Sequence, residues 1–319
     1  QVRSLFKHPK LIKILEFPVL FLGATPQKTP ALYSLMNYAD LKLGTWYPMG
    51  GMFKIIEAFV AIGKEQGVEF RAGEEVVRIH YKNNKANALE TNMGIFEMDA
   101  IVAAADYHHV DRDLLPPAVA NYSEKYWDTR VMAPSSLLFY LGIDRKVQGL
   151  LHHNLFFDED FEVHAHEIYN SHQWPQKPLF YICAPSISDN TVAPPGMENL
   201  FVLIPTSTQL TGDDEPMRNK YLHMVMDRLK AVKGIDFSSN IVYQRSYGIS
   251  DFKSDYHAFK GNAYGLANTL SQTALLKPAM RSKKLNNLYF AGQLTLPGPG
   301  MPPSIISGRM AAQSIIKNL

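Results

Sequence analysis

Apolar positions recur along this chain with two different periods, which separate helical stretches from strand-rich ones. Spacings of three and four residues predict helices over 1–22, 52–66, 212–232 and 304–317. We expect the first helix to be broken at Pro9 and near Pro18, because proline interrupts the helical hydrogen bonds. A further helical stretch is expected within 23–47. The apolar stripe of 52–66 is expected to pack on a core; its members are Phe53, Ile56, Phe59, Val60 and Ile62.

Segments that alternate in polarity or are rich in β-branched residues predict strands. They are 68–71, 75–81, 86–91, 95–98, 99–105, 136–143, 153–157, 164–169, 178–185, 199–205, 241–246 and 288–291. The run 99–105 (DAIVAAA) is continuously apolar, as expected of a strand buried on both faces.

The order of these elements predicts a mixed α/β fold with a discontinuous domain. A helix, a hairpin and a buried strand occupy 48–118, strands dominate 119–250, and a strand and a closing helix return in 251–319. We therefore expect 48–118 and 251–319 to form one domain. We expect 119–250 to form a second domain with a mixed or antiparallel sheet and helices, and 1–47 to form a helical part of its own.

Composition excludes several classes of protein. Of the 319 residues, 46% are apolar and 19% charged, which is typical of a globular chain. A net charge of +2 is too weak to indicate nucleic-acid binding. The single cysteine, Cys183, excludes an internal disulfide and any zinc site with two cysteines, and it fits a reducing cytoplasm. No uncharged apolar run approaches the ~18 residues of a membrane-spanning helix.

The segment 287–308 (NLYFAGQLTLPGPGMPPSIISG) carries the chemistry. A short buried strand ends at Gly292, where a missing side chain admits a ligand to the backbone. A glycine- and proline-rich loop then leads to a helix whose free N–H groups point forward. This arrangement suits an anion, a phosphate or a ring carbonyl that gains charge, such as the pyrimidine edge of a flavin. An ordinary strand, turn and helix with no ligand is an equal alternative on these residues alone.

Six stretches together resemble the bacterial-type phytoene desaturases, a branch of the FAD-dependent amine oxidase-like flavoproteins. They are WYPMGG (46–51), EVVRI (75–79), 99–115, 178–205 with its APPGMENLFVLIP, 256–282 and 287–308. The resemblance covers nearly the whole chain in the family's order. It implies a glutathione-reductase-like FAD-binding domain made of 48–118 and 251–319, and a substrate domain between them.

The resemblance also implies roles for individual residues. Val76 matches the strand position whose backbone meets the adenine of FAD, and Gly292 lies near the ribose or diphosphate. Gln293 stands where many amine oxidase relatives have an acidic residue. Met301, Pro302 and Pro303 approach the flavin ring. The residues on the substrate side of the flavin are Gly261, Asn262, Ala263 and Tyr264.

The implied reaction is desaturation of a phytoene-like polyene in carotenoid biosynthesis, with hydride transfer from substrate to flavin. Carotene isomerisation, carotenoid oxygenation and retinol saturation on the same fold remain open, and an amine or porphyrinogen oxidase is a third reading. The implied partner is a long apolar polyene that resides in a bilayer. Arg3, Lys7, Lys10 and Lys13 beside apolar side chains predict a peripheral contact of this cytoplasmic protein with the membrane surface.

One feature of the family is missing. No G-x-G-x-x-G follows a strand in this sequence, although such a loop admits the pyrophosphate of a dinucleotide. Because the chain starts at Gln1 in an amphipathic pattern, we expect a fragment, with roughly one third of the protein, including the Rossmann βαβ unit, upstream. The fragment alone is expected to bind FAD poorly and to be inactive.

Several polar residues after predicted strands have a structural interpretation. Asp106 is expected to cap a helix, and no catalytic role is assigned to it, to His108 or to His109. Neighbouring strand residues face opposite sides, so His152 and His153 are not expected to chelate one ion together. His164 and His166 would share a strand face but lack a carboxylate partner. No metal site is therefore expected.

Overall fold

The computed structural model describes residues 2–19 and 23–318, which form two compact units. Unit 1 comprises 2–19, 31–70 and 135–250, and unit 2 comprises 23–30, 71–134 and 251–318. Unit boundaries thus fall after residues 70, 134 and 250, whereas the expected domain limits are 47, 118 and 250. The functional assignment of those domains stays a prediction.

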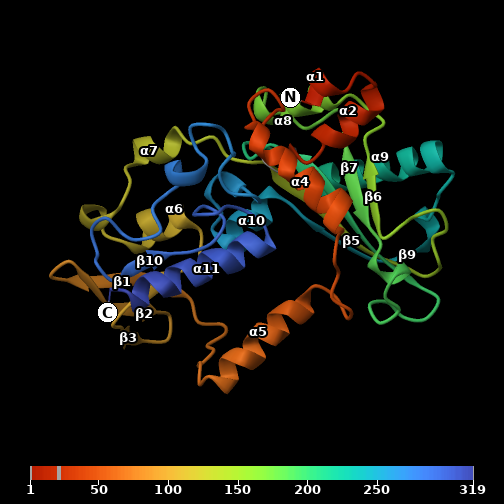
Figure 1. Cartoon of the computed structure of the whole chain (residues 1–319). Helices are drawn as coiled ribbons and strands as arrows, with labels where there is room; N and C mark the ends of the chain where they lie inside the picture. Colours follow the sequence, from red (N-terminus) through yellow and green to blue (C-terminus); the bar gives the residue numbers. More distant parts are fainter. Residues whose placement is uncertain (1, 20–22, 319) are drawn as a thin grey trace. The chain divides into compact units, whose positions relative to one another are not determined.

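Unit 1 is built on a five-stranded antiparallel sheet in the order β6-β7-β8-β5-β9 (Figure 1). Its strands are β5 (Ser135–Ile143), β6 (His153–Phe156), β7 (Phe180–Cys183), β8 (Glu198–Thr206) and β9 (Ile241–Tyr247). Strands β5 and β8 pair along their whole length, from Ser135 opposite Thr206 to Ile143 opposite Glu198. This long pairing forms the centre of the sheet.

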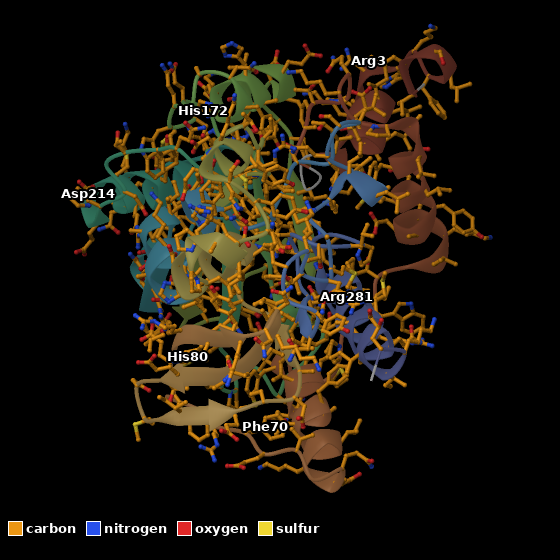
Figure 2. The ribbon with its side chains drawn as sticks, turned by 90° about the vertical axis from the view of Figure 1, so that its left-hand side faces the viewer. Arg3, Phe70, His80, His172, Asp214 and Arg281 are labelled. Atoms are coloured by element: carbon orange, nitrogen blue, oxygen red, sulfur yellow. The ribbon has the colours of Figure 1, made fainter. Side chains whose placement is uncertain are left out.

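One face of this sheet is covered by α9 (Glu215–Lys233). Tyr221, Val225 and Leu229 of α9 join the inward residues of the strands, such as Phe139 and Ile182, in one buried cluster. Asp214, which is labelled in Figure 2, is the N-cap of this helix, and its side chain accepts a 2.9 Å hydrogen bond from Met217 N. Gly234 ends it in the left-handed conformation, with φ of 68°. The predicted helix at 212–232 is therefore confirmed.

The remaining helices of unit 1 are short, except for the helix α5. They are α1 (Val2–Leu5), α2 (Pro9–Glu16), the 3-10 helix η1 (Ala31–Ser34), α4 (Leu35–Tyr38), the π-helix η2 (Ala39–Leu43), α5 (Phe53–Glu65), α8 (Phe161–Tyr169), η5 (Pro185–Ile187) and η6 (Ser238–Asn240). The break before Pro9, the helical stretch within 23–47 and the helix at 52–66 are confirmed. Helix α10 (Ile249–Tyr256) begins at the end of unit 1 and continues into unit 2.

Unit 2 contains two small sheets. An antiparallel sheet is formed by β1 (Val76–Lys82), β2 (Lys85–Thr91) and β3 (Ile95–Glu97), and a parallel pair by β4 (Ile101–Ala103) and β10 (Leu288–Phe290). Its helical segments are α6 (Tyr107–His109), η3 (Val110–Leu114), η4 (Pro117–Val119), α7 (Glu124–Asp128), η7 (Phe259–Gly261), η8 (Ala274–Leu276) and α11 (Met301–Ile316). In the core, Tyr107 stacks on Phe290 at 3.8 Å and packs against the fully buried Trp127.

Three expectations are wrong. Residues 68–71 form no strand. The strand in 99–105 is limited to Ile101–Ala103, and the side chain of Val102 is 40% exposed, so the strand is not buried on both faces. Residues 164–169 are the second half of the helix α8, because Asp160 accepts hydrogen bonds from Glu162 N and Val163 N and starts a helix there.

The apolar stripe of α5 also differs from expectation. Phe53, Ile56, Phe59 and Ile62 are exposed, and no residue of the helix is buried. The 3.6-residue period therefore predicted the helix correctly, but within the described residues of unit 1 the stripe is not buried against a core.

Candidate functional site

Two parallel strands of unit 2 end at the same edge. Leu288, Tyr289 and Phe290 of β10 pair with Ile101, Val102 and Ala103 of β4, and Ala291 N continues the ladder with a 3.0 Å bond to Ala103 O. Ligands of α/β proteins bind beyond the carboxyl ends of such strands. A pocket of about 590 Å³ lies at this edge. Its lining includes 104–107 after β4, 291–294 after β10, and parts of α10, α11 and the loop at 257–263.

The backbone at Gly292 is open toward this pocket. Its φ of 107° lies in the region that favours glycine. Gly292 N donates to Ser307 Oγ at 2.9 Å, and Ser307 Oγ donates to Ser304 O at 2.7 Å. Thr295 holds the other side, since its N and Oγ1 both donate to Gly292 O, at 3.1 and 2.8 Å. The turn is thus fixed by α11 and by its own loop, while its exposed edge faces the pocket.

A second polar network positions Gln293. Gln293 Nε2 donates to Asn262 Oδ1 at 3.0 Å, and Gly265 N donates to the same oxygen at 2.7 Å. Asn262 Nδ2 in turn donates to Phe259 O at 2.8 Å. Gly265, with φ of 73°, lies so close to the backbone of Gln293 that a Cβ there would come within 2.9 Å of Gln293 O. This network joins the two segments that the sequence placed near a flavin.

Helix α11 begins at the pocket without a side-chain cap. Its N-cap is Gly300, with φ of 114°, and Met301, Pro302 and Pro303 form the first turn, three residues earlier than predicted. Two residues of the helix, Ser304 and Gly308, line the pocket. Pro302 and Pro303 have no N–H and Ser304 N donates to Gly300 O at 2.9 Å, so it is mainly the positive end of the helix dipole that favours an electron-rich ligand edge at this end.

A buried amine lies behind the Gly/Pro loop. Lys277 Nζ is buried and has no hydrogen-bond partner in the described part of the chain. A Cβ at Gly298 would lie 3.6 Å from this atom. Burial lowers the pKa of Lys277 to about 8. An orphaned cationic donor, an uncapped helix end and an open glycine at the end of a parallel strand pair together fit an electron-rich, partly anionic group such as a flavin.

The side chain of Asp106, just after β4, holds the neighbouring backbone, as expected. Asp106 Oδ1 accepts from His108 N at 2.9 Å and His109 N at 3.3 Å, and Asp106 Oδ2 accepts from Phe259 N at 3.1 Å. The predicted cap is thereby confirmed. Burial raises the pKa of this carboxyl group, and the three N–H donors oppose the rise.

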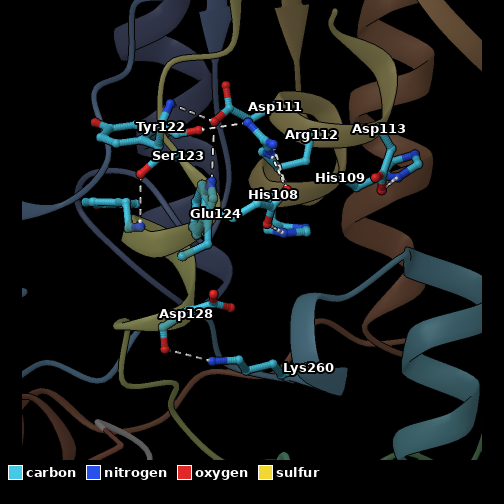
Figure 3. A network of polar contacts seen from close by, with 12 residues as sticks. His108, His109, Asp111, Arg112, Asp113, Tyr122, Ser123, Glu124, Asp128 and Lys260 are labelled. Atoms are coloured by element: carbon cyan, nitrogen blue, oxygen red, sulfur yellow. Dashed lines mark hydrogen bonds and ion pairs between the residues drawn. The ribbon is translucent and has the colours of Figure 1, made fainter. Parts of the chain in front are cut away.

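The polar network beyond this turn is also structural (Figure 3). Asp111 accepts from Asn121 N, Tyr122 N and Trp127 Nε1, and Arg112 pairs with Glu124 at 2.7 Å. His109 Nδ1 lies 2.8 Å from Asp113 Oδ2. These contacts tether the segment 107–124 within unit 2.

The structure brings some predicted site residues together and separates others. Gly292, Gln293, Asn262 and Ala263 line the pocket. Met301, Pro302 and Pro303 lie in the turn just before its lining residues on α11, whereas Gly261 and Tyr264 flank the lining residues of their loop without belonging to them. Val76 lies at the start of β1, outside the pocket lining.

Sequence reasoning missed two contributors. Ser307 fixes the loop through a contact that only the folded chain reveals, although a serine three residues after Ser304 is a helical neighbour that the spacing could have indicated. Nothing in the sequence distinguishes Lys277 from surface lysines.

Two interpretations of histidine pairs are wrong. On helix α8, His164 and His166 do not share a face: His164 is buried and His166 exposed. His164 Nδ1 accepts from Leu179 N and Nε2 donates to Pro205 O, each at 3.1 Å, so the ring is a neutral structural link, and burial lowers its pKa to about 4. The rings of His152 and His153 bring a nitrogen each to the same place. This is possible because His152 precedes β6, so its side chain does not have to point to the side opposite that of His153.

Comparisons with known proteins agree with this mixed α/β fold. The family model described as flavin containing amine oxidoreductase matches residues 1–316. The chain is 40% identical to the carotenoid 3,4-desaturase of Haloarcula japonica over 319 residues, all of this chain and 64% of the relative. It is 30% identical over 321 residues to the 4,4'-diapophytoene desaturase (4,4'-diaponeurosporene-forming) of Staphylococcus aureus, covering 97% of this chain and 64% of the relative.

Solved structures share the fold at low identity. An oxidoreductase from Methanosarcina mazei aligns with a TM-score of 0.63 and 16% identity over 94% of this chain and 64% of its own. Cyclohexylamine oxidase from Brevibacterium oxydans aligns with a TM-score of 0.53 and 14% identity over 99% of this chain and 66% of its own.

The chain belongs to the flavin containing amine oxidoreductases, a family whose cofactor is FAD. Within that family it is similar to carotenoid desaturases, and it spans 64% of the length of the curated relatives it matches. Among the helices of the described residues, none has both the length and the apolarity needed to cross a bilayer.

Proposed function

We propose that this chain is the larger part of an FAD-dependent desaturase that removes hydrogen from adjacent carbons of a phytoene-like carotenoid precursor. The observation that carries the proposal is the pocket at the ends of β4 and β10, which is lined by the open backbone of Gly292 and by Ser304 and Gly308 of α11, just after the uncapped start of that helix. The names of two similar desaturases supply the substrate class.

Each part of the pocket has a role in this proposal. Gly292 admits the cofactor to the backbone, and Met301, Pro302 and Pro303 present the first turn of α11 to its pyrimidine edge. Asn262 and Ala263 form the substrate side, and the bond from Gln293 Nε2 to Asn262 Oδ1 holds the two sides in register. When bound, the flavin accepts the hydride. The proton has no assigned acceptor among these residues.

The second half of the cofactor site belongs to the same proposal. A dinucleotide needs a glycine-rich turn for its pyrophosphate, and no G-x-G-x-x-G follows a strand in residues 1–319. A Rossmann βαβ unit outside this sequence would supply that turn and complete a discontinuous FAD domain. The purified 1–319 chain should then be colourless and inactive, whereas a yellow chain with stoichiometric FAD would contradict this part of the proposal.

The N-terminal part of unit 1 supports a peripheral contact with a membrane. Helices α2 and α4 are joined by a 3.0 Å bond from Asn37 Nδ2 to Leu15 O. Their neighbourhood exposes many large apolar side chains: Leu5, Phe6, Leu11, Ile14, Leu32, Leu35, Leu41, Leu43 and Trp46. Such a surface is unusual for a protein wholly in water and suits the acyl boundary from which an apolar polyene must be taken.

The basic residues contribute less than the sequence indicates. Arg3 is paired with Glu16 and Glu162, each at 2.9 Å, and Lys13 Nζ donates to Phe157 O and Glu159 O. Because Arg3 is neutralised by two carboxylates and Lys13 is held by backbone oxygens, membrane binding should depend on apolar contact more than on anionic lipid.

Product analysis tests the reaction. The complete protein with FAD, supplied with a phytoene-like polyene, should give a product that has lost two hydrogens for each new double bond and absorbs at longer wavelength. Geometric isomers of unchanged mass would indicate an isomerase, added oxygen an oxygenase, and added hydrogen a saturase. Any of these would overturn the desaturase proposal while leaving the flavin site intact.

A further inference from the structure

A cluster of metal-ligating side chains lies in unit 1, outside the flavin pocket. One ring nitrogen each of His152 and His153 and the sulfur of Cys183 all lie within 4.8 Å of one another. His153 and Cys183 are direct partners across the antiparallel pair β6 and β7, so both point to the same face of the sheet. Phe156, Phe180 and Ile182 point to the opposite face, into the core beneath α9.

The backbone before β6 brings His152 to the same place. Ala184 N donates to His152 O at 2.8 Å and extends the ladder beyond the strand ends. His152 is in a bend rather than in the strand, so its ring can turn toward its neighbour. The rings of His152 and His153 lie 4.4 Å apart at 41°, and Tyr47 packs edge-on against His152 at 4.8 Å.

Hydroxyl groups orient both imidazoles. His152 Nδ1 lies 2.8 Å from Ser188 Oγ, and His153 Nδ1 lies 2.6 Å from Tyr181 Oη. Histidine ligands in metal sites characteristically use one ring nitrogen for the ion while the other is held by a neighbouring polar group. The Nδ1 contacts therefore leave Nε2 of each ring for a ligand.

One of these nitrogens is an unexplained buried polar atom. His152 Nε2 is buried and has no hydrogen-bond partner in the described part of the chain. Leaving such an atom without a partner costs about 1–3 kcal/mol, and native structures rarely do so without a reason. Among the ring nitrogens of the cluster in the described residues, it is the one that is both buried and without a partner, so it indicates a missing ligand.

We propose that His152, His153 and Cys183 bind one Zn²⁺ ion through two imidazole nitrogens and a thiolate, with a fourth position open to water or another small ligand. This donor set is one that zinc takes in proteins, and three protein ligands leave an open position. The site is separate from the flavin pocket and does not depend on the proposed desaturase activity.

The geometry requires only a small adjustment. Tetrahedral zinc with bonds of about 2.0–2.3 Å places its ligand atoms roughly 3.3–3.8 Å apart. The present separations are all within 4.8 Å, so they exceed this range by about one ångström at most, and the exposed ring of His153 can move by that amount. Binding replaces the S–H bond of Cys183 by a Zn–S bond and releases one proton to solvent.

Cobalt(II) gives a direct test, because it occupies zinc sites and its spectrum reports the ligands. The chelator-treated 1–319 chain should bind one Co²⁺, with the strong visible bands of tetrahedral cobalt and a thiolate-to-cobalt charge-transfer band. Since Cys183 is the single cysteine, that band can come from no other residue. Equimolar Zn²⁺ should abolish the spectrum.

Variants identify the ligands. Cys183→Ser should remove the charge-transfer band, and His152→Gln and His153→Gln should each weaken Co²⁺ binding at least tenfold. His166→Gln, an exposed histidine on α8, is the matched control and should leave binding unchanged. The proposal is overturned if no tetrahedral spectrum develops, or if both histidine variants bind as tightly as the parent chain.

A measurement on the parent chain avoids any loss of folding in the variants. Zn²⁺ should slow the reaction of Cys183 with a thiol reagent at least tenfold, whereas Mg²⁺ should have no effect. Equal reaction rates with and without Zn²⁺ would exclude ligation by Cys183 and so contradict the site.

Discussion

The side-chain amide of Gln293 donates a 3.0 Å hydrogen bond to Asn262 Oδ1, and this bond connects the segment after β10 with the loop after η7. Asn262 cannot turn its amide to suit another partner, because Oδ1 also accepts from Gly265 N and Nδ2 donates to Phe259 O. A donor at position 293 is therefore required to keep this bond.

Gln293→Glu should lower the free energy of unfolding by about 1–2 kcal/mol, because a carboxylate would face the oxygen of Asn262 and donate nothing to it. Urea unfolding of the chain measures this loss. The control is Gln313→Glu, an exposed position on α11 that should change stability by less than about 0.5 kcal/mol. Equal losses in the two variants would show that the bond to Asn262 is unimportant.

Gly265→Ala should destabilise the chain by about 2–4 kcal/mol, since the left-handed backbone disfavours a side chain and the new Cβ would press on Gln293 O. Gly73→Ala is the matched control: its φ of 71° is nearly the same, but no atom lies within 4 Å of its Cβ. It should lose about 1–2 kcal/mol from strain alone. If Gly265→Ala loses no more stability than Gly73→Ala, the distance between position 265 and Gln293 O is larger than the structure shows.

Lys277→Met should stabilise the flavin-free chain by about 1–3 kcal/mol at pH 7. Burial lowers the pKa of Lys277 from 10.5 to about 8, so the folded state binds a proton less readily than the unfolded state. Above pH 10.5 the amine is neutral in both states, so its protonation costs the folded chain nothing. As the pH falls from 10.5 to 8, the unfolded chain binds the proton first, so the free energy of unfolding decreases; below pH 8 this loss is complete.

The gain from Lys277→Met should therefore shrink as the pH rises from 8 to 10.5, which chemical unfolding at several pH values measures. The exposed Lys284→Met is the control and should show no such pH dependence. If the gain in the free energy of unfolding stays constant over this range, burial does not lower the pKa of Lys277 as the structure indicates.

Exchanging Leu35 and Leu41 for serine should weaken binding to phospholipid vesicles at least tenfold, because each of these exposed side chains contributes about 1.5–3 kcal/mol when it is buried. They are 63% and 70% exposed. Leu275→Ser removes a leucine that is 89% exposed in unit 2 and should not affect sedimentation with vesicles. Binding that falls equally with Leu275→Ser would place the contact elsewhere.

Local patterns predicted most elements, and the failures have identifiable causes. Hairpin β1-β2, strand β8 and helix α9 follow from period and turn residues alone. The segment 161–169 alternates in a way that fits either a strand or a helix, and the cap at Asp160 decides for the helix. The stripe of α5 predicted a helix, but a pattern cannot tell whether its packing partner is present.

The site was predictable only in part. Gly292 and the start of α11 are visible in the sequence because glycine and proline mark the turn. The parallel pairing of β4 with β10 joins residues far apart in the chain, so the position of the pocket between 104–107 and 291–294 could not be derived from spacing. Lys277 and the cluster of His152, His153 and Cys183 likewise depend on tertiary contacts.

Anaerobic single turnover tests the central claim most directly. The complete protein, loaded with FAD, is mixed with a phytoene-like polyene, and the flavin absorbance and the mass of the polyene are followed together. The account predicts that one flavin is bleached for each double bond formed, with loss of two hydrogens from the polyene. A polyene of unchanged mass beside fully oxidised flavin would contradict it.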